Sequence, residues 1–293
     1  MKGLKLRLMA GVLAAASFVS LMGCSGKDNF EFDGSRSITV VSREDGSGTR
    51  GAFIELLGIE EKTATTRRDH TTKRSLIANK TGVMLTTVQT DEYATGYLSM
   101  GSVNEDVKAV KIDGVELTAE NVENGLYKLA RPFVIAIDDT TSNLAFDFID
   151  FILSEEGQDV VAESYAKIDS KAPSYEGSRP SGRIVVAGSS SVTPVMEKLA
   201  ESYLAINPDA EIEIQQTDST SGLMAVSSGT ADIGMASRDL KESEKESLTG
   251  INIAVDAIAI IVNPLNPVDS LTSEQAHDIF TGEVSTWEGV SAE

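Results

Sequence analysis

The residues best suited to chemistry in this sequence lie in one stretch, Ser42–Arg50, which reads SREDGSGTR. It brings a guanidinium from Arg43 close to hydroxyls from Ser47 and Thr49. A β-branched apolar run at 38–41 precedes the stretch and predicts a buried strand, and the amphipathic segment after it predicts a helix. The turn between them presents the unpaired N–H groups and positive dipole end of a helix N-terminus. The stretch therefore predicts an oxyanion site.

One such turn is a common feature, but the chain repeats the same order of elements twice. Residues 184–187 predict a strand and 188–193 a Ser-rich turn, and Pro194 then opens a helix with Thr193 as its N-cap. The third unit has its turn at 217–222 and a short helix directly after it. Alternating strands and helices predict an α/β fold with mostly parallel sheets. Because such sheets bind ligands beyond the carboxyl ends of their strands, we expect the three turns to share one site.

The candidate set mixes hydrogen-bond donors with two carboxylates, Asp45 and Asp232. A fully ionised anion such as sulfate would be repelled by them, whereas hydrogen phosphate can donate its O–H to a carboxylate. This pattern favours phosphate over sulfate. Each hydroxyl taken alone could equally serve as an N-cap. The full set is Arg43, Asp45, Ser47, Gly48, Thr49, Ser190, Ser191, Ser221, Asp232, Ser237 and Arg238.

The composition sets limits on the partners. The chain has 293 residues, enough for one large or two ordinary domains, and is 41% hydrophobic and 24% charged, as soluble globular proteins are. A net charge of −20 argues against nucleic acid and against anionic membrane surfaces as partners. An anion must therefore be captured by a local positive site against an unfavourable overall field.

The sequence offers little to support catalysis, so we expect a protein that is not an enzyme. The two histidines, His70 and His277, lack the spacing of metal ligands, and no phosphate-binding P-loop motif is present. Residues 164–167 fit Ser-x-x-Lys and residues 80–82 fit Lys-Thr-Gly, but their order is the reverse of the penicillin-binding enzymes. We interpret that match as coincidence.

Residues 1–24 predict a targeting segment, with a basic start and an apolar run that is too short for a membrane span. The segment ends in LMGC at 21–24, which resembles the lipobox of bacterial lipoproteins and implies that Cys24 is lipidated. The alternative is an ordinary secretion signal with an incidental cysteine. Cys24 is the only cysteine, so no disulfide is expected. We therefore predict a lipid-anchored protein on the extracytoplasmic face of the cell membrane.

The rest of the chain divides into a polar tether and two blocks. Residues 25–36 predict the tether, 37–173 the first α/β lobe and 183–293 the second. The segment between them, 174–182, has the composition of a linker. The apolar run at 251–262 is long for one strand and predicts two strands with a bend near Asp256.

Four segments together resemble one protein family. They are SREDGSGTR at 42–50, GSSSVTP at 188–194, DIGMASR at 232–238 and IFTGEVSTW at 279–287. On these motifs the chain resembles the phosphate-binding proteins of bacterial ABC importers over nearly everything after Arg36. The resemblance implies the type II periplasmic-binding-protein fold, with two hinged α/β lobes and mixed, mostly parallel sheets. It also implies that inorganic phosphate binds between the lobes through hydrogen bonds, with no metal or cofactor.

The resemblance also assigns the phosphate contacts, motif by motif. One lobe would contribute Arg43, Asp45, Ser47, Gly48 and Thr49. The other would contribute Ser190, Ser191, the amides of Val192 and Thr193, Ser221 and Asp232, and Ser237 of the pattern above completes the set.

The order of the motifs departs from the family. The half that contains GSSSVTP, DIGMASR and the tryptophan motif comes first in the family, whereas here it follows the SREDGSGTR half. We therefore expect a circularly permuted chain, with the family's termini joined through 172–183 and new termini near the hinge. Two alternatives remain open: a domain-swapped or paired assembly, and a piece of a longer tandem array.

The predicted function is that of a lipid-anchored receptor that captures inorganic phosphate and delivers it to the permease subunits of an ABC transporter, with its lobes closing on the ligand. The alternative is a non-transport lipoprotein that keeps the binding fold for phosphate sensing or adhesion. An enzyme acting on phosphoesters is disfavoured, because no general base such as histidine lies near the turns.

Overall fold

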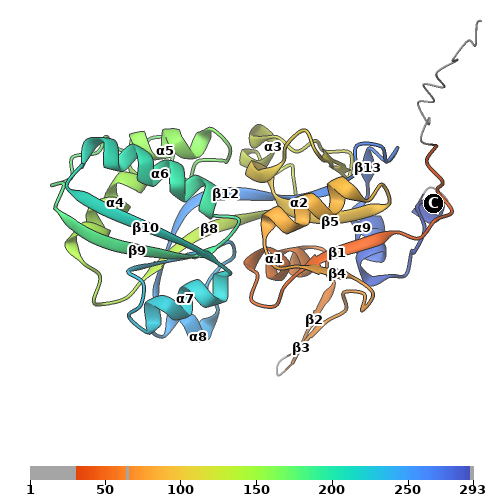
Figure 1. Ribbon diagram of the computed structural model, residues 1–293, viewed down its shortest axis with the longest axis horizontal. Coiled ribbons are helices and arrows are strands. Elements are labelled where there is room, and N and C mark those ends of the chain that lie inside the picture. The colour runs from red at the N-terminus through yellow and green to blue at the C-terminus, as the bar shows by residue number, and fades with distance from the viewer. Residues whose placement is uncertain (1–30, 64–65, 291–293) are drawn as a thin grey trace, which may run out of the picture. The chain divides into compact units, whose positions relative to one another are not determined.

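The main β-sheet positions every part of the candidate site, and strand β12 (Thr249–Val262) runs through its middle. Strand β8 (Ala130–Ile137) pairs antiparallel with β12 from Thr249 to Ala257, and β5 (Ala94–Ser99) pairs with its other edge from Ile258 to Val262. The structure is a computed structural model that describes residues 31–63 and 66–290 (Figure 1). Because β12 is one continuous strand, residues 251–262 do not form two strands as predicted. They contain a bulge between Asn252 and Ala254.

The strand order in this sheet is β10–β9–β11–β8–β12–β5–β1–β4, with β6 also beside β12. Two groups of strands are parallel, β9 with β10 and β11, and β1 with β4 and β5, and the antiparallel β8 and β12 lie between them. The mixed α/β fold is confirmed. The bounds not yet given are β1 (Thr39–Arg43), β4 (Leu76–Ala78), β6 (Lys108–Ala109), β9 (Gly182–Ser189), β10 (Ala210–Thr217) and β11 (Ile233–Ala236).

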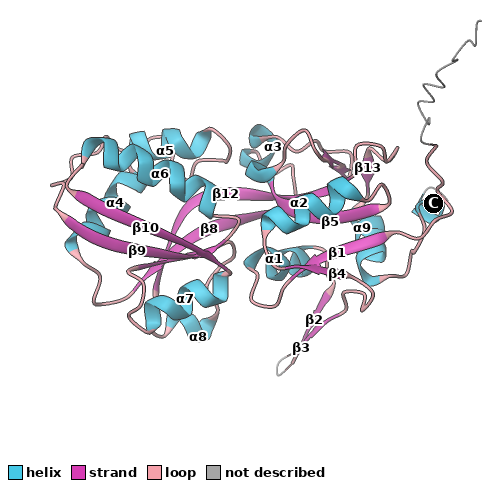
Figure 2. Cartoon of the chain, in the orientation of Figure 1, coloured by secondary structure: helices cyan, strands magenta, loops and turns pink. Residues whose placement is uncertain are grey.

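Helices cover this sheet, and two short strand pairs lie beside it (Figure 2). The strand pairs are β2 (Glu60–Lys62) with β3 (Arg67–Asp69), and β7 (Lys111–Ile112) with β13 (Ser270–Leu271). The helices are α1 (Gly48–Leu56), α2 (Thr81–Thr90), the 3-10 turn η1 (Met100–Ser102), α3 (Ala119–Glu123), α4 (Asn143–Leu153), α5 (Glu155–Ala162), α6 (Thr193–Ile206), α7 (Ser219–Ser227), α8 (Glu242–Lys245), α9 (Ser273–Thr281) and α10 (Trp287–Val290).

Two helix starts differ from the prediction by a few residues. Helix α7 begins at Ser219, inside the predicted turn, because the Asp218 side chain caps it by accepting from the backbone N–H of Ser221. Helix α6 includes Thr193, whose hydroxyl donates to the carbonyl of Ser189, and its N-cap is Val192.

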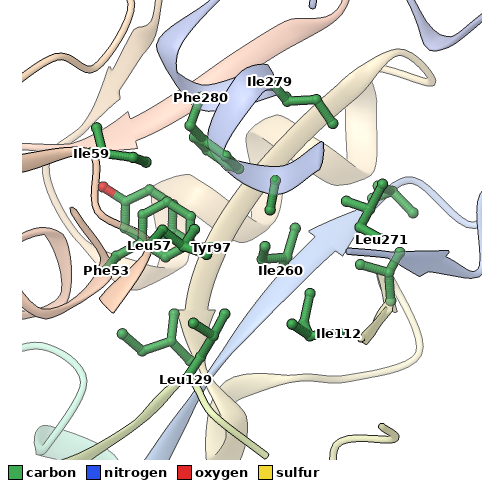
Figure 3. Close-up of a cluster of buried hydrophobic side chains, with 14 of the residues drawn as sticks. Phe53, Leu57, Ile59, Tyr97, Ile112, Leu129, Ile260, Leu271, Ile279 and Phe280 are labelled. Atoms are coloured by element: carbon green, nitrogen blue, oxygen red, sulfur yellow. The ribbon is translucent and has the colours of Figure 1, made fainter. Parts of the chain in front are cut away.

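The buried apolar side chains form two main groups. The first core region includes Phe53, Tyr97 and Phe280, and Figure 3 shows these rings close together. Phe53 and Tyr97 stack at 3.8 Å between centroids, and Phe280 meets the Phe53 ring edge-on. Trp287 belongs to the same region, and its indole N–H donates to the carbonyl of Tyr93. The second core region lies around Phe133, Phe148, Met196, Tyr203 and Met235.

The boundary between these regions differs from the lobes expected on either side of 174–182. Residues 257–290 supply the first region together with 40–129, whereas Ile253 and Ala254 belong to the second. The two regions change over on β8 between Ala130 and Phe133 and on β12 between Ala254 and Ala257. The reason is that this antiparallel pair runs through both, so each strand contributes side chains to two cores.

The expected linker is held against the body of the protein. The buried carboxylate of Asp147 on α4 accepts hydrogen bonds from the backbone N–H of Ser178 at 2.7 Å and from the hydroxyls of Tyr175 and Tyr203. Burial opposes ionisation of Asp147, but these hydrogen bonds outweigh it and lower the pKa of Asp147. Residues 174–182 are therefore held against the second core region, on which Tyr175 packs.

The start of the described chain packs beside its end. The Ile38 N–H donates to the carbonyl of Ser285 at 2.9 Å, and the Glu288 N–H donates to that of Gly34 at 2.8 Å. Phe32 stacks on Tyr93 at 4.9 Å, so the last part of the predicted tether packs on the first core region. The predicted lipobox and Cys24 lie outside the described residues.

Candidate functional site

The N-terminus of α1 forms the first wall of the candidate site. Strand β1 ends at Arg43, and the Ser47 side chain caps the helix by accepting from the N–H of Arg50 at 3.3 Å. Thr49 follows and is 1% exposed. A Cβ atom on Gly48 would lie 2.7 Å from Ser237 Oγ, so only glycine allows the helix to approach the opposite wall this closely.

The second wall comes from the ends of β9, β10 and β11. Because these strands are parallel, their carboxyl ends meet at one edge of the sheet, as the sequence predicted. Ser189 ends β9, Ser219 opens α7 after β10, and Ser237 follows β11. Ser189 Oγ donates to Ser237 Oγ at 3.0 Å, and Ser219 Oγ accepts from the Ser237 N–H at 3.1 Å.

Hydrogen bonds join the two walls within one chain. Arg43 Nη2 donates to Ser190 Oγ at 3.0 Å, and the hydroxyls of Thr49 and Ser191 lie 2.8 Å apart. Thr81 at the start of α2 contacts the same Ser190 hydroxyl at 3.2 Å. The result is a buried cluster of hydroxyls around one guanidinium, which we call the hydroxyl cluster. Its members are Arg43, Thr49, Thr81, Ser189, Ser190, Ser191, Ser219 and Ser237, each at most 6% exposed.

Arg43 is the cation of this cluster. Its Nε and Nη2 form two hydrogen bonds of 2.8 Å with the carboxylate of Glu44, and Nε also donates to the carbonyl of Ala78. Its Nη1 is buried and has no hydrogen-bond partner among the described residues. An unpaired buried donor costs about 1–3 kcal/mol, and more when it is charged. An anion that accepts from Nη1 would remove this cost.

The two carboxylates expected at the site lie elsewhere. The Asp45 side chain is 99% exposed and forms an ion pair with Arg50 at 2.8 Å. Asp232 precedes β11, and its carboxylate accepts from the N–H of Val185 at 2.8 Å. It therefore lies at the opposite end of β11 from Ser237. In this structure neither carboxylate joins the hydroxyl cluster, so the selection of hydrogen phosphate by these two groups has no geometric support.

Two other expected contacts need revision, those of Ser221 and of the Val192 amide. Ser221 is exposed, and its hydroxyl donates to Asp218 on the outside of α7. The N–H of Val192 donates to the carbonyl of Ser189 at 3.0 Å, so it is used within the turn. Thr193 is buried, and its hydroxyl donates to the same carbonyl, whereas the expected contact through its backbone N–H stays a prediction.

Sequence reasoning missed three members of the cluster: Ser189, Ser219 and Thr81. Ser189 was within the Ser-rich turn, directly before two residues that were chosen. Ser219 directly follows the capping residue Asp218, and Thr49 lies two positions after the capping residue Ser47. The position of Ser219 in the first turn of a helix was therefore a signal that the sequence offered. Thr81 gave a weak signal, because Lys80, the N-cap residue before α2, makes no side-chain cap.

A buried ion pair lies where the two core regions change over. Arg131 Nε and Nη2 donate to Asp256 Oδ2 at 3.0 and 2.9 Å, and Arg131 Nη1 donates to the carbonyl of Ser237 at 3.0 Å. The other carboxylate oxygen accepts from the Ser99 hydroxyl and the Met100 N–H. Burial raises the pKa of Asp256, with Arg131 and Ser99 acting in the opposite direction. The pair thus connects the ends of β5 and β11 and touches the site through Ser237.

Two other features bear on the class of protein. Among the helices of the described ranges, none combines the length and apolar character that crossing a bilayer requires. Within those same ranges, His, Cys, Asp and Glu side chains do not gather in groups of three or more that could hold a metal ion.

The class follows from comparison with known families. A family model described as "PBP superfamily domain" matches residues 28–156 and 173–292, so the chain belongs to that superfamily. Phosphate-binding protein PstS 2 of Streptococcus agalactiae is 44% identical over 295 residues, which cover 98% of this chain and 100% of that protein. The crystal structure of a phosphate-binding protein of a phosphate ABC transporter from Streptococcus pneumoniae is 42% identical, with a TM-score of 0.69 over 87% of this chain and 99% of that one. Within the superfamily, the chain belongs to the family of these phosphate-binding proteins, the substrate-binding components of ABC importers.

Proposed function

We propose that this chain captures inorganic phosphate in the hydroxyl cluster and delivers it to the permease of an ABC importer outside the cytoplasmic membrane. The 44% identity over the full length of a protein named for phosphate binding supports phosphate as the ligand. The single observation that carries the site is the buried Arg43 Nη1, a charged donor with no partner in the described chain, beside hydroxyls from two walls.

Hydroxyl groups suit phosphate near neutral pH, since each can donate to an ionised oxygen or accept from a protonated one. In this proposal Ser190, Ser191 and Ser219 take the accepting role that Asp45 and Asp232 had in the prediction. The N-termini of α1, α6 and α7 add backbone donors and the positive ends of their dipoles. Phosphate binds by replacing the direct hydrogen bonds between the two walls, and the chain flexes near the Arg131–Asp256 pair to admit it.

The decisive experiment is isothermal titration of the protein lacking residues 1–24 with phosphate and, separately, with sulfate. We expect heat with phosphate and much weaker binding of sulfate. Absence of heat with phosphate would reject the proposed ligand, and equal heats would reject its selectivity. Hydrolysis of a phosphoester by the purified protein would instead favour the enzyme alternative.

Transport can be separated from sensing in cells. Deletion of the gene should abolish high-affinity phosphate uptake if the protein serves a permease. Normal uptake after deletion, together with phosphate binding in vitro, would favour the non-transport alternative.

The lipid anchor at Cys24 is a further part of the proposal and rests on the LMGC sequence alone. We expect the wild-type protein to partition into a detergent phase and the Cys24→Ala variant to appear in the aqueous phase. Aqueous partitioning of the wild type would contradict the anchor.

We also infer that the halves of this chain are circularly permuted relative to many relatives. Phosphate-binding protein PstS of Pseudomonas aeruginosa matches over 143 residues, 43% of this chain and 44% of that protein, as expected when only one half can align in order. The hydrogen bonds between residues 34–38 and 285–288 keep the two ends close. A chain cut within 176–178 and joined from residue 290 to residue 34 by a short linker should therefore fold and bind phosphate. Loss of helical circular dichroism would contradict this.

A further inference from the structure

Residues 66–80 differ in charge from the rest of the chain, and we call them the basic segment. They contain five Lys or Arg and one Asp, in a chain with 25 Lys and Arg against 45 Asp and Glu. The segment comprises β3, β4 and their connection. All five of its cations are exposed: Arg67, Arg68, Lys73, Arg74 and Lys80.

Hydrogen bonds hold the basic segment at the edge of the hydroxyl cluster. The carbonyl of Ala78, at the end of β4, accepts from Arg43 Nε at 3.2 Å and from the Glu44 N–H at 3.3 Å. Lys80 directly precedes Thr81, a member of the cluster.

The other end of the segment is fixed beside α1. Arg50 donates to Asp69 on β3 with Nε and Nη2, at 3.0 and 2.8 Å, and its Nη1 donates to Asp45 and to the carbonyl of Arg43. The Arg50 side chain therefore links β3, which carries Arg67 and Arg68, to the end of β1 at Arg43.

This placement matters because of the overall charge. A chain with a net charge of −20 repels a phosphate ion within the screening length, which is about 8 Å at physiological salt and about 30 Å at 0.01 M. A cluster of cations at the entrance of a site can reverse the local field, and such steering raises association rates by about 10- to 1000-fold.

We propose that the basic segment is an electrostatic entrance that steers the anion into the hydroxyl cluster. The proposal rests on the proposed function, since it concerns the approach of phosphate to that site. It acts on the association rate and leaves the dissociation rate unchanged, because its cations do not belong to the buried cluster that holds the ligand.

The test compares two variants with the same net charge. One replaces four cations of the segment, Arg67→Gln, Arg68→Gln, Lys73→Gln and Arg74→Gln. The control replaces four exposed lysines of other elements, Lys111→Gln, Lys128→Gln, Lys171→Gln and Lys198→Gln. Both lose four positive charges, so any difference between them reports position.

Binding of inorganic phosphate is followed by stopped flow between 0.01 and 0.3 M salt, with an environment-sensitive dye on a cysteine introduced as Asp239→Cys in every protein, all lacking residues 1–24. We expect the wild-type association rate to fall as salt rises. The segment variant should associate about 10-fold more slowly at low salt, on the scale that steering supplies, with the dissociation rate unchanged. The control should retain the salt dependence of the wild type.

A wild-type association rate that rises with salt would show that the net charge dominates and would overturn the proposal. Equal rates for the segment variant and the control would overturn it as well. The milder variant Arg67→Gln/Arg68→Gln should give a partial effect, which guards against misfolding of the fourfold variant. Absence of phosphate binding by the wild type at equilibrium would reject the proposed function itself, whereas normal binding with the wrong salt dependence rejects only the steering.

Discussion

At the residue scale, the buried guanidinium of Arg43 sets the chemistry of the site. Glu44 orients it with two hydrogen bonds, and Nη1 remains for a ligand. Charge-assisted hydrogen bonds are worth about 1.5–3 kcal/mol, which corresponds to about 10- to 100-fold in affinity.

We therefore expect Arg43→Met to weaken phosphate binding by about 10- to 100-fold. Asp232→Asn is the matched comparison, because Asp232 was a predicted contact that the structure pairs with the N–H of Val185. Its phosphate dissociation constant should stay within about 2-fold of the wild type, less than one ordinary hydrogen bond is worth. Titration calorimetry measures both, and a larger loss in Asp232→Asn than in Arg43→Met would contradict the assignment.

Two serines of α7 allow a second comparison two positions apart. Ser219 is buried in the hydroxyl cluster, whereas Ser221 is exposed on the outside of the helix. Ser219→Ala should weaken phosphate binding by about 2- to 10-fold, the value of one neutral hydrogen bond. Ser221→Ala should bind as the wild type does. The reverse ranking would restore the contact first expected from the sequence.

The outcome at these residues shows what the sequence could specify. Ser47, Thr49, Ser190 and Ser191 could be predicted, because strand–turn–helix order alone places their side chains at helix N-termini. Asp232 and Ser237 cannot both contact one phosphate ion, because five residues of extended chain separate them by about 16 Å. For Asp45 the sequence had no means to decide between a ligand and Arg50 as its partner.

At the element scale, the segment 174–182 shows how one buried carboxylate can fix a stretch with linker composition. Asp147 accepts from the Ser178 N–H and from two tyrosine hydroxyls. The Gly, Pro and Ser content could predict that the segment lacks regular structure, but not that hydrogen bonds to Asp147 hold it against α4. The residue that holds the segment, Asp147 on α4, lies 28 positions before Tyr175 and 31 before Ser178 in the sequence.

Asp147→Asn should lower the free energy of unfolding by about 1–3 kcal/mol at pH 7, because it weakens hydrogen bonds to a charged acceptor. The folded-state pKa of Asp147 is lowered, so its stabilising effect is present above the unfolded pKa of 3.8 and is lost as pH falls through the folded pKa. The difference between wild type and variant should therefore shrink between pH 5 and pH 3. Urea unfolding at each pH checks this, and a constant difference would contradict it.

At the scale of the whole molecule, the Arg131–Asp256 pair joins two core regions whose boundary the sequence did not locate. Strand patterns predicted α/β halves, but a division by sequence position cannot represent two antiparallel strands that contribute to both cores. The apolar run at 251–262 was the available signal, since a strand of that length exceeds what one half needs.

Arg131→Met leaves the Asp256 carboxylate buried without its cation and should cost about 3–5 kcal/mol of unfolding free energy. The double variant Arg131→Met/Asp256→Asn should recover at least half of that loss, because Asn keeps an acceptor for Ser99 and Met100. Denaturant unfolding of the single and double variants provides the measurement. A double variant no more stable than the single one would mean that the pair stabilises through packing, not charge.

The position of Trp287 has a consequence for spectroscopy. It is the only tryptophan in the sequence, and it is buried in the first core region with its N–H on Tyr93. Its emission therefore reports the melting of that region alone, whereas far-ultraviolet dichroism also records α4, α5 and α6 of the second. If the two signals lose amplitude at different urea concentrations, the gap between their midpoints measures how far the two core regions unfold independently.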